Sequence, residues 1–252
     1  MVQKTNIEDK KNNLRTRHDF FYFLIATRYL LNYKHLFEET FQTKTLDSLG
    51  GWLEKLNQSD IKSMKDDRIN ELSRDNNVNE VITNFFGLRT FGSMVIVYSA
   101  LCLESLINDY CVFRKSSTYF KNHIDKLDTP SKWLLVPKII TNKEISSDSE
   151  TYELIKDLYS LRNSLVHPKS KEVDIDSDDN IIKNELGVSL FNKTKRSYLA
   201  IVKATNALYN IDRSFKHLED YKFLWDKNGD FNNISDVYSF YSSFYSSIDI
   251  EI

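Results

Sequence analysis

Apolar residues recur at helical spacing along most of the chain. In the first such stretch, from about Leu14 to Phe41, positions at steps of four, three and four form a stripe: Phe20, Leu24, Thr27 and Leu31. A stripe of this kind is typical of an amphipathic helix that packs one face against a core. The pattern therefore predicts a long helix in this part of the chain.

The most hydrophobic segment lies further along, from about Phe91 to Arg114. It contains no proline, so the pattern predicts a long central helix that is buried on most sides. Between these two helices, the sequence breaks at Leu49–Gly51 and then predicts two weaker helical pieces, around Leu53 and from Asp60 to Arg74.

Proline and serine mark the next helix boundaries. The stretch SKWLLVPKII, residues 131–140, predicts a short helix that is kinked or ended near Pro137, because proline lacks the amide hydrogen that an interior helical position donates. Either Ser147 or Ser149 is expected to cap the helix that follows, since a serine hydroxyl accepts from the exposed amides of a first turn.

That following helix starts near Glu150. Its leucines again recur at steps of four, three and four: Leu154, Leu158, Leu161 and Leu165. These leucines are expected to face the core. Because Pro168 disfavours helical torsions at His167, the helix is expected to end there, with the imidazole turned away from the regular spiral.

A charged loop at 170–180 separates this helix from a further long one at about 189–215. In the tail, aromatic residues alternate with serines over 234–252, which predicts either a helix capped by Ser235 or a strand around 238–241. The tail is expected to dock on its own domain or on a partner. Taken together, the pattern predicts an all-α bundle.

Composition agrees with long helices in a folded chain. The 252 residues include only 6 glycines and 3 prolines, and 41% are hydrophobic, which is enough to build a core. We expect three parts: an N-terminal helical extension packed on the core (1–90), a helical core (91–217) and an aromatic C-terminal segment (218–252).

Charge and cysteine usage narrow the class of protein. The formal net charge is -2, so no strong basic field attracts a long nucleic acid, and any such contact must be local. The N-terminal sequence has no secretory signal, and the apolar run at 20–31 is too short to span a membrane. Cys102 and Cys111 fall in one predicted helix, about 13 Å apart by helical rise, too far for a disulfide. We therefore expect a soluble cytoplasmic protein that has no membrane contact.

Candidate chemistry concentrates at Arg162, Asn163 and His167, just before Pro168. In an unbroken helix the arginine and histidine would diverge by about 140°. If the helix ends before the proline, both can reach the same rim, and Asn163 can orient one of them by hydrogen bonding. The alternative is that both cations simply offset the dipole at a helix end.

The ligand that fits these groups is an RNA phosphodiester. A guanidinium donates to phosphate oxygens in a forked geometry, and an imidazole can move a proton near neutral pH, without a metal ion or cofactor. One histidine cannot comfortably serve as both base and acid. A homodimer that brings two such rims together would supply the second group.

Arg162, Asn163 and His167 resemble the motif of the HEPN superfamily, and the stretch YSALCLESLINDY resembles that family's first core helix, with Glu104 at its acidic position. The resemblance implies a HEPN-like helical bundle and a metal-independent endoribonuclease at a dimer interface, cleaving RNA by 2′-hydroxyl attack to leave a cyclic phosphate. It also implies a role as a toxin or in phage defence, with a neutralising antitoxin or regulatory partner. Glu104 would support the site, or pair with Arg162.

Further cations lie near the motif in the sequence. They are expected either to hold flanking RNA phosphates or to be solvated: Lys169, Lys171, Lys193, Lys195 and Arg196. The remaining histidines have no ligand-like spacing, so we expect no metal site. The acidic run at 172–179 would repel RNA if it folded back over the site. An alternative function is therefore a non-catalytic HEPN-fold module that binds a nucleotide or a protein partner.

Overall fold

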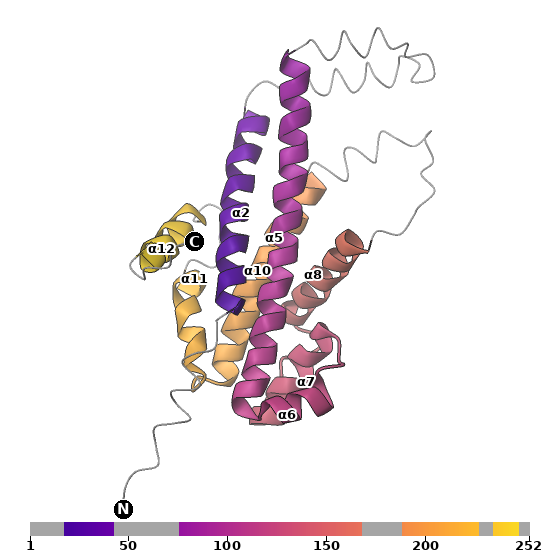
Figure 1. Cartoon of the computed structure of the whole chain (residues 1–252), viewed down its shortest axis with the longest axis vertical. Coiled ribbons are helices and arrows are strands. Elements are labelled where there is room, and N and C mark those ends of the chain that lie inside the picture. Colours follow the sequence, from indigo (N-terminus) through magenta and orange to yellow (C-terminus); the bar gives the residue numbers. More distant parts are fainter. Residues whose placement is uncertain (1–17, 43–75, 168–187, 227–233, 247–252) are drawn as a thin grey trace, which may run out of the picture.

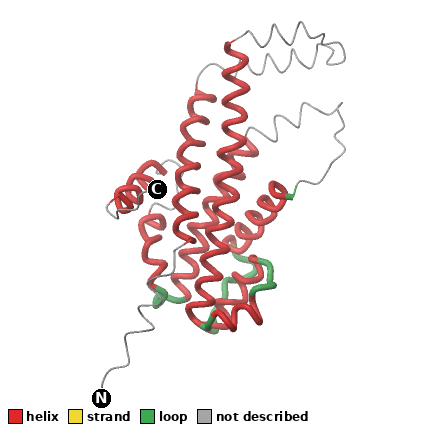
Figure 2. The backbone as a smooth tube through the Cα atoms, viewed as in Figure 1, coloured by secondary structure: helices red, strands yellow, loops and turns green. Residues whose placement is uncertain are grey.

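The computed structural model describes residues 18–42, 76–167, 188–226 and 234–246. Within these ranges every regular element is a helix and no strand is present, as Figure 2 shows. The predicted all-α class is confirmed. The two weaker helical pieces predicted around Leu53 and from Asp60 to Arg74 lie outside the described residues.

Helices α2 (His18–Gln42) and α5 (Asn76–Arg114) form an antiparallel pair at the centre of the bundle (Figure 1). The first matches the predicted helix closely, whereas α5 begins before the predicted start at Phe91. Two glycines bring its neighbours close. A Cβ atom on Gly87 would lie 2.6 Å from Leu36 Cδ2, and one on Gly92 would lie 2.9 Å from Thr194 Oγ1. The early part of α5 thus lies close to α2 at Gly87 and close to α10 at Gly92.

The remaining helices surround this pair. Helix α5 is followed by α6 (Ser117–Tyr119), the π-helix η2 (Phe120–Ile124) and α7 (Thr129–Thr141). Helix α10 (Val188–Ile211) packs against α5 and against α8 (Glu150–Val166).

One buried core joins these elements. It includes side chains that are at most 2% exposed from five helices: Phe23, Ile96, Trp133, Leu158 and Leu208. The predicted boundary between 1–90 and 91–217 falls inside α5, so the same helix belongs to both segments. Cys102 and Cys111 are thiols buried in this core, as expected.

Helix α7 continues through Pro137 to Thr141, so of the two predicted alternatives, a kink or an end near this proline, the end does not occur. The loss of one amide donor is tolerated because α7 is held at both ends. Asp128 caps its start by accepting from the Ser131 amide, and Asn142 closes its end in the left-handed conformation, with φ of 60°. Thr141 Oγ1 also donates to the Pro137 carbonyl oxygen at 2.9 Å.

Helix α8 begins and ends where the sequence predicts. The Ser149 hydroxyl accepts from the Tyr152 amide at 3.2 Å, which confirms one of the two serines expected to cap it. Leu154 and Leu158 are buried, but Leu165 is 39% exposed, so the expectation that it faces the core was wrong. In Figure 1 the end of α8 leads away from α5, and residues 163–167 are exposed among the described parts of the chain.

The aromatic tail is helical, which decides between the helix and the strand. Helix α12 (Ile234–Ser246) packs on α2, with Ile234 and Val237 each 1% exposed. Its Phe240 ring stacks at 4.1 Å on Phe223 from α11 (Lys222–Asp226), which follows the 3-10 helix η4 (Lys216–Tyr221). The tail thus docks on its own domain.

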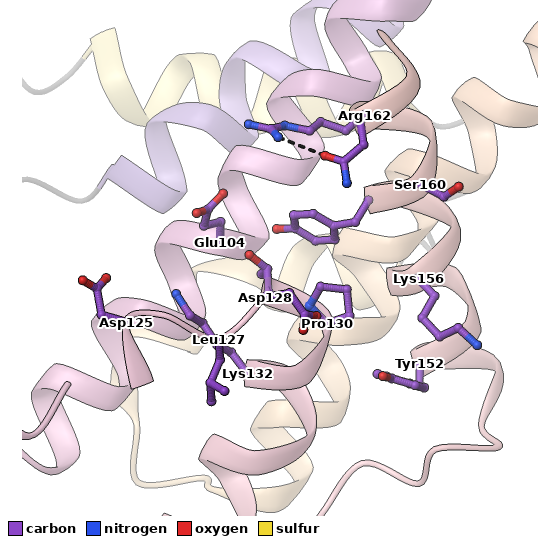
Figure 3. Close-up of a pocket in the computed structure, with 13 residues that line it drawn as sticks. Glu104, Asp125, Leu127, Asp128, Pro130, Lys132, Tyr152, Lys156, Ser160 and Arg162 are labelled. Atoms are coloured by element: carbon purple, nitrogen blue, oxygen red, sulfur yellow. Dashed lines mark hydrogen bonds between the residues drawn. The ribbon is translucent and has the colours of Figure 1, made fainter. Parts of the chain in front are cut away.

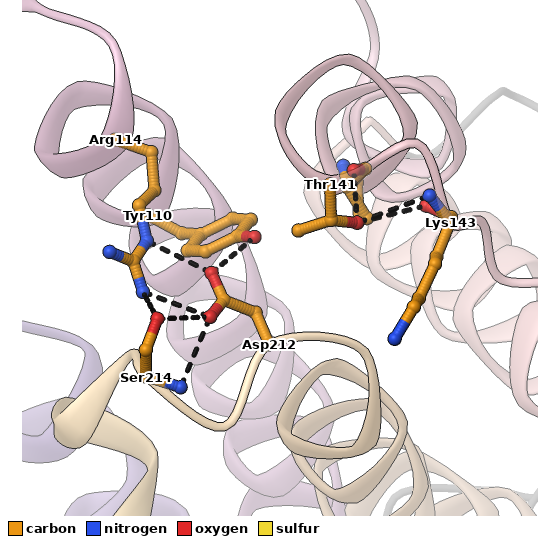
Figure 4. Close-up of polar contacts among 7 residues, drawn as sticks. Tyr110, Arg114, Thr141, Lys143, Asp212 and Ser214 are labelled. Atoms are coloured by element: carbon orange, nitrogen blue, oxygen red, sulfur yellow. Dashed lines mark hydrogen bonds and ion pairs between the residues drawn. The ribbon is translucent and has the colours of Figure 1, made fainter.

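A polar cluster fixes the end of α10 to the end of α5 (Figure 4). The Asp212 carboxylate pairs with Arg114 at 2.9 Å and accepts from the Tyr110 hydroxyl at 3.0 Å. It also accepts from the Ser214 hydroxyl at 2.6 Å and amide at 3.1 Å. Because Asp212 is only 8% exposed, these contacts compensate for the removal of its charge from water.

Within the described residues, one stretch, Phe86–Arg114, is long and apolar enough to cross a membrane, with a mean hydropathy of 1.6 in its best window. Half of that window is buried inside the bundle. Core helices of soluble proteins have the same length and composition, so this stretch assigns no location to the protein.

Candidate functional site

The motif residues occupy the last turn of α8. His167 leaves the helical conformation, with φ of -123° and ψ of 66°, and its amide donates to the Asn163 carbonyl oxygen at 2.9 Å. This confirms that the helix ends just before Pro168. The whole segment from Asn163 to His167 is exposed to solvent.

Arg162 is held by its neighbour. Its Nη1 donates to the Asn163 Oδ1 atom at 3.0 Å, which is the hydrogen bond expected between these two side chains. The guanidinium is half-buried, and no carboxylate of the described residues forms an ion pair with it. Arg162 therefore keeps a positive charge and free donors that could be used by an anionic ligand.

The side chains of Arg162 and Asn163 border an open cleft of about 660 Å³ between α5, the start of α7 and α8 (Figure 3). A volume of this size is within the range of small-molecule and nucleotide sites. His167 is not among the residues that line this cleft. Use of Arg162 and His167 in one site therefore stays a prediction.

Charged side chains of both signs line the cleft. The acids come from α5 and from the turn before α7, and the bases from α7 and α8: Glu104, Asp125, Asp128, Lys132, Lys156 and Arg162. At formal charges the two groups cancel. The cleft is thus suited to a ligand that carries both an anionic group and hydrogen-bond donors, and less suited to a simple anion.

Glu104 is half-buried and faces the cleft from α5. No hydrogen bond or ion pair joins it to Arg162 or to another side chain in the described ranges. Burial and the negative charge of Glu104 raise the pKa of the Tyr159 hydroxyl well above its usual range, and the charge of Arg162 acts in the opposite direction. Tyr159 donates to the Ala100 carbonyl oxygen at 2.6 Å, so it is a fixed wall of the cleft.

Lys132, a buried lysine of the cleft, was not among the site residues predicted from the sequence. It is 4% exposed, and its Nζ donates to Asn108 Oδ1 at 3.1 Å and lies 5.2 Å from the centre of the Phe120 ring. The available signal in the sequence was a charged residue, Lys132, at an inward position of the apolar stretch 131–140. Lys156, whose Nζ lies 5.7 Å from the Tyr152 ring, was missed as well because only the folded chain shows that it lines the same cleft as Arg162.

The cations proposed as weak RNA contacts separate into two groups. Lys193 and Lys195 are exposed on α10, whereas Arg196 is engaged in an ion pair with Asp157 of α8 at 2.7 Å. Lys169 and Lys171 lie outside the described residues, as does the acidic run at 172–179. Lys193, Lys195 and Arg196 do not line the cleft.

No group of three or more histidine, cysteine, aspartate or glutamate residues in the described ranges could hold a metal ion. Compared with protein-family models, curated proteins and solved structures, the chain matches none. Functional inference therefore depends on the residues of the α8 end and of the cleft.

Proposed function

We propose that this protein is a metal-independent endoribonuclease of the HEPN type, built on a HEPN-like bundle and acting on RNA in the cytoplasm. The observation that carries the proposal is the Arg162 guanidinium, which has no ion pair within the described residues and is held by Asn163 at the border of an open cleft, five residues before an exposed histidine. Arg114, in contrast, forms an ion pair with Asp212.

In the proposed reaction the RNA 2′-oxygen attacks the adjacent phosphorus while the bond from phosphorus to the 5′-oxygen breaks. His167 takes the proton of the 2′-hydroxyl, and the leaving 5′-oxygen receives a proton from a second acid. Arg162 stabilises the charge that builds up on the phosphoryl oxygens. The products are a 2′,3′-cyclic phosphate and a 5′-hydroxyl.

A homodimer would supply the second acid as another copy of His167. Leu165 and Val166 support this assembly, because they are 39% and 45% exposed directly beside the motif, and exposed apolar pairs of this kind favour association. Val166→Asp is expected to shift the dimer to monomer in sedimentation velocity and to reduce cleavage. Ile139→Asp, at a similarly exposed site on α7, is the matched control that should change neither.

The nuclease test uses the full chain and RNA in the presence of a chelator. His167→Ala and Arg162→Ala are each expected to lower the cleavage rate by about 10²-fold or more. Because both positions are at the solvent-facing end of α8, the midpoint of unfolding of each variant should stay close to that of the wild type. His35→Ala and Arg213→Ala, exposed histidine and arginine positions away from α8, are the controls.

Cleavage that persists in His167→Ala, or that requires added metal, would refute this mechanism. The second candidate is a non-catalytic module that binds a nucleotide or a regulatory protein partner. It is favoured by one observation, that His167 does not line the cleft beside Arg162. Nucleotide binding without any cleavage by the wild-type chain would decide for it. A toxin or phage-defence role, with an antitoxin as partner, belongs to the proposal of a nuclease.

A further inference from the structure

The cleft beside Arg162 contains a buried cation whose bonding is incomplete. A charged lysine that is 4% exposed needs compensation, because removing an ammonium group from water is costly. The Lys132 ammonium has three N–H donors, and the acceptor found for it is Asn108 Oδ1 at 3.1 Å. No ion pair involving Lys132 is formed within the described part of the chain. An acceptor atom of a bound ligand would complete its shell.

A carboxylate that has no hydrogen-bond or ion-pair partner among the described residues lines the same cleft as this ammonium group. Glu104 and Asn108 are four residues apart on α5, so they occupy the same face one turn apart, with Cβ atoms about 5–6 Å from each other. Since Asn108 holds the Lys132 ammonium, a donor and a two-oxygen acceptor both border the cleft from the same face of α5. In Figure 3, Glu104 and Lys132 lie on one side of the cleft, away from Lys156 and Tyr152.

This pairing of groups distinguishes the four RNA bases. Guanine presents one acceptor, O6, followed by two adjacent donors, N1–H and N2–H. A lysine beside a carboxylate complements that edge: the ammonium donates to O6 and the two carboxylate oxygens accept from N1–H and N2–H. Adenine, cytosine and uracil lack two adjacent donors on this edge, so each would leave a carboxylate oxygen or the ammonium group unsatisfied.

The other side of the cleft suits the rest of a nucleotide. Lys156 supplies positive charge there and the Tyr152 ring adds an aromatic surface, while Arg162 borders the cleft from further along α8 and supplies a second positive charge for a phosphate (Figure 3). A free phosphate or sulfate would fit less well, because it would meet the carboxylates of Glu104, Asp125 and Asp128 in the same cleft. The mixed charge thus favours a nucleotide over an inorganic anion.

We propose that this cleft is a guanine-binding site, in which Lys132 and Glu104 read the base and Arg162 contacts the adjoining phosphate. The site deepens the proposed function, on which it rests for RNA as the natural ligand, and it makes guanosine the nucleotide next to the cleaved bond.

Isothermal titration calorimetry of the full chain with GMP, AMP, CMP and UMP tests the site without requiring cleavage. GMP is expected to bind about tenfold more tightly than the other three, as a two-point contact to a base edge is worth this much or more. Glu104→Gln keeps the shape but replaces one acceptor by a donor, so it should remove the preference for GMP and change AMP binding little. Glu153→Gln, on the exposed face of α8, should leave all four affinities unchanged.

Lys132→Met is the second variant, because methionine fills a similar volume without the charge. The variant should lower the affinity for GMP about tenfold, and its urea unfolding curve shows whether the fold is kept. If this variant does not fold, Glu104→Gln decides alone, since Glu104 is only half-buried.

Equal affinity for all four nucleotides, no binding of any, or an unchanged preference in Glu104→Gln would overturn the guanine site. Its failure is distinct from failure of the nuclease. A chain that binds GMP selectively but never cuts RNA refutes the nuclease and keeps the site. A chain that cuts RNA after all four nucleotides equally, with no preference in calorimetry, refutes the site and keeps the nuclease.

Discussion

Replacement of Asp212 by asparagine is expected to weaken the attachment of α10 to α5. The carboxylate pairs with Arg114 at 2.9 Å, accepts from Tyr110 at 3.0 Å and accepts from Ser214 at 2.6 Å, while only 8% of the residue is exposed. Asparagine has nearly the same shape but no charge, and it offers one acceptor oxygen where the carboxylate offers two. The substitution therefore removes the charge and one acceptor while it keeps the shape of the side chain.

The size of the effect follows from the burial of the pair. Removing one partner of a fully buried ion pair costs about 3–5 kcal/mol. The Arg114 side chain keeps 22% exposure, so water replaces part of the lost interaction. We expect the free energy of unfolding at neutral pH to fall by about 2–3 kcal/mol in Asp212→Asn.

The effect should also depend on pH in a definite direction. Burial raises the pKa of Asp212, but the hydrogen bonds from Ser214 and Tyr110 and the charge of Arg114 outweigh it, so the pKa lies below its ordinary value. A carboxyl group with a lowered folded pKa contributes its full stability above its unfolded pKa, about 3.9, and loses it as the pH falls through the folded pKa. The gap between wild type and variant should therefore be constant near neutral pH and shrink below about pH 4.

Urea unfolding followed by helical circular dichroism, at a series of pH values from neutral to acid, measures this gap. Glu153→Gln removes an exposed carboxylate on α8 and serves as the control, with little change at any pH. Two results would contradict the reasoning: a variant as stable as the wild type at neutral pH, or a gap that persists unchanged in acid.

Three further outcomes can be checked by simpler measurements. Gly92→Ala should lower the free energy of unfolding by about 1 kcal/mol, because the new Cβ lies 2.9 Å from Thr194 Oγ1 and this crowding exceeds the gain in helix propensity; a raised urea midpoint would show that the close approach can relax. Ser149→Ala should also cost about 1 kcal/mol through loss of the α8 cap, and Ser149→Asp should restore it; equal stability of all three forms would mean that the cap is not needed. Cys102 and Cys111 should react with a thiol reagent far more slowly in the folded than in the urea-unfolded chain, because both are buried and burial raises the pKa of the Cys111 thiol; fast labelling of the folded protein would indicate an open core.

Local sequence signals predicted the elements well where one residue type fixes the backbone. Pro168 predicted the end of α8, and Ser149 was one of two serines predicted to cap its start. Both effects act over a few residues and need no tertiary contact. Pro137 shows the limit of such signals, because α7 continues past it once both ends of the helix are capped.

Helical periodicity predicted which face of a helix is apolar, but not how far a neighbour covers it. Leu154, Leu158 and Leu165 belong to one stripe of α8, and only the first two are buried. In the tail, the alternation of serine and aromatic residues allowed a strand or a helix. The structure has a helix there, α12, which packs on α2 and buries Val237. Both outcomes depend on where other helices lie.

The sequence by itself determined the helical class, the position of the motif and the end of α8 before Pro168, because these depend on periodicity and on proline and serine chemistry within a few residues. Tertiary structure alone decided the cleft. Glu104, Lys132 and Arg162 come from α5, α7 and α8, and no spacing along the chain relates them. Their meeting depends on how three helices pack, which is set by the buried core and not by the residues that face the ligand.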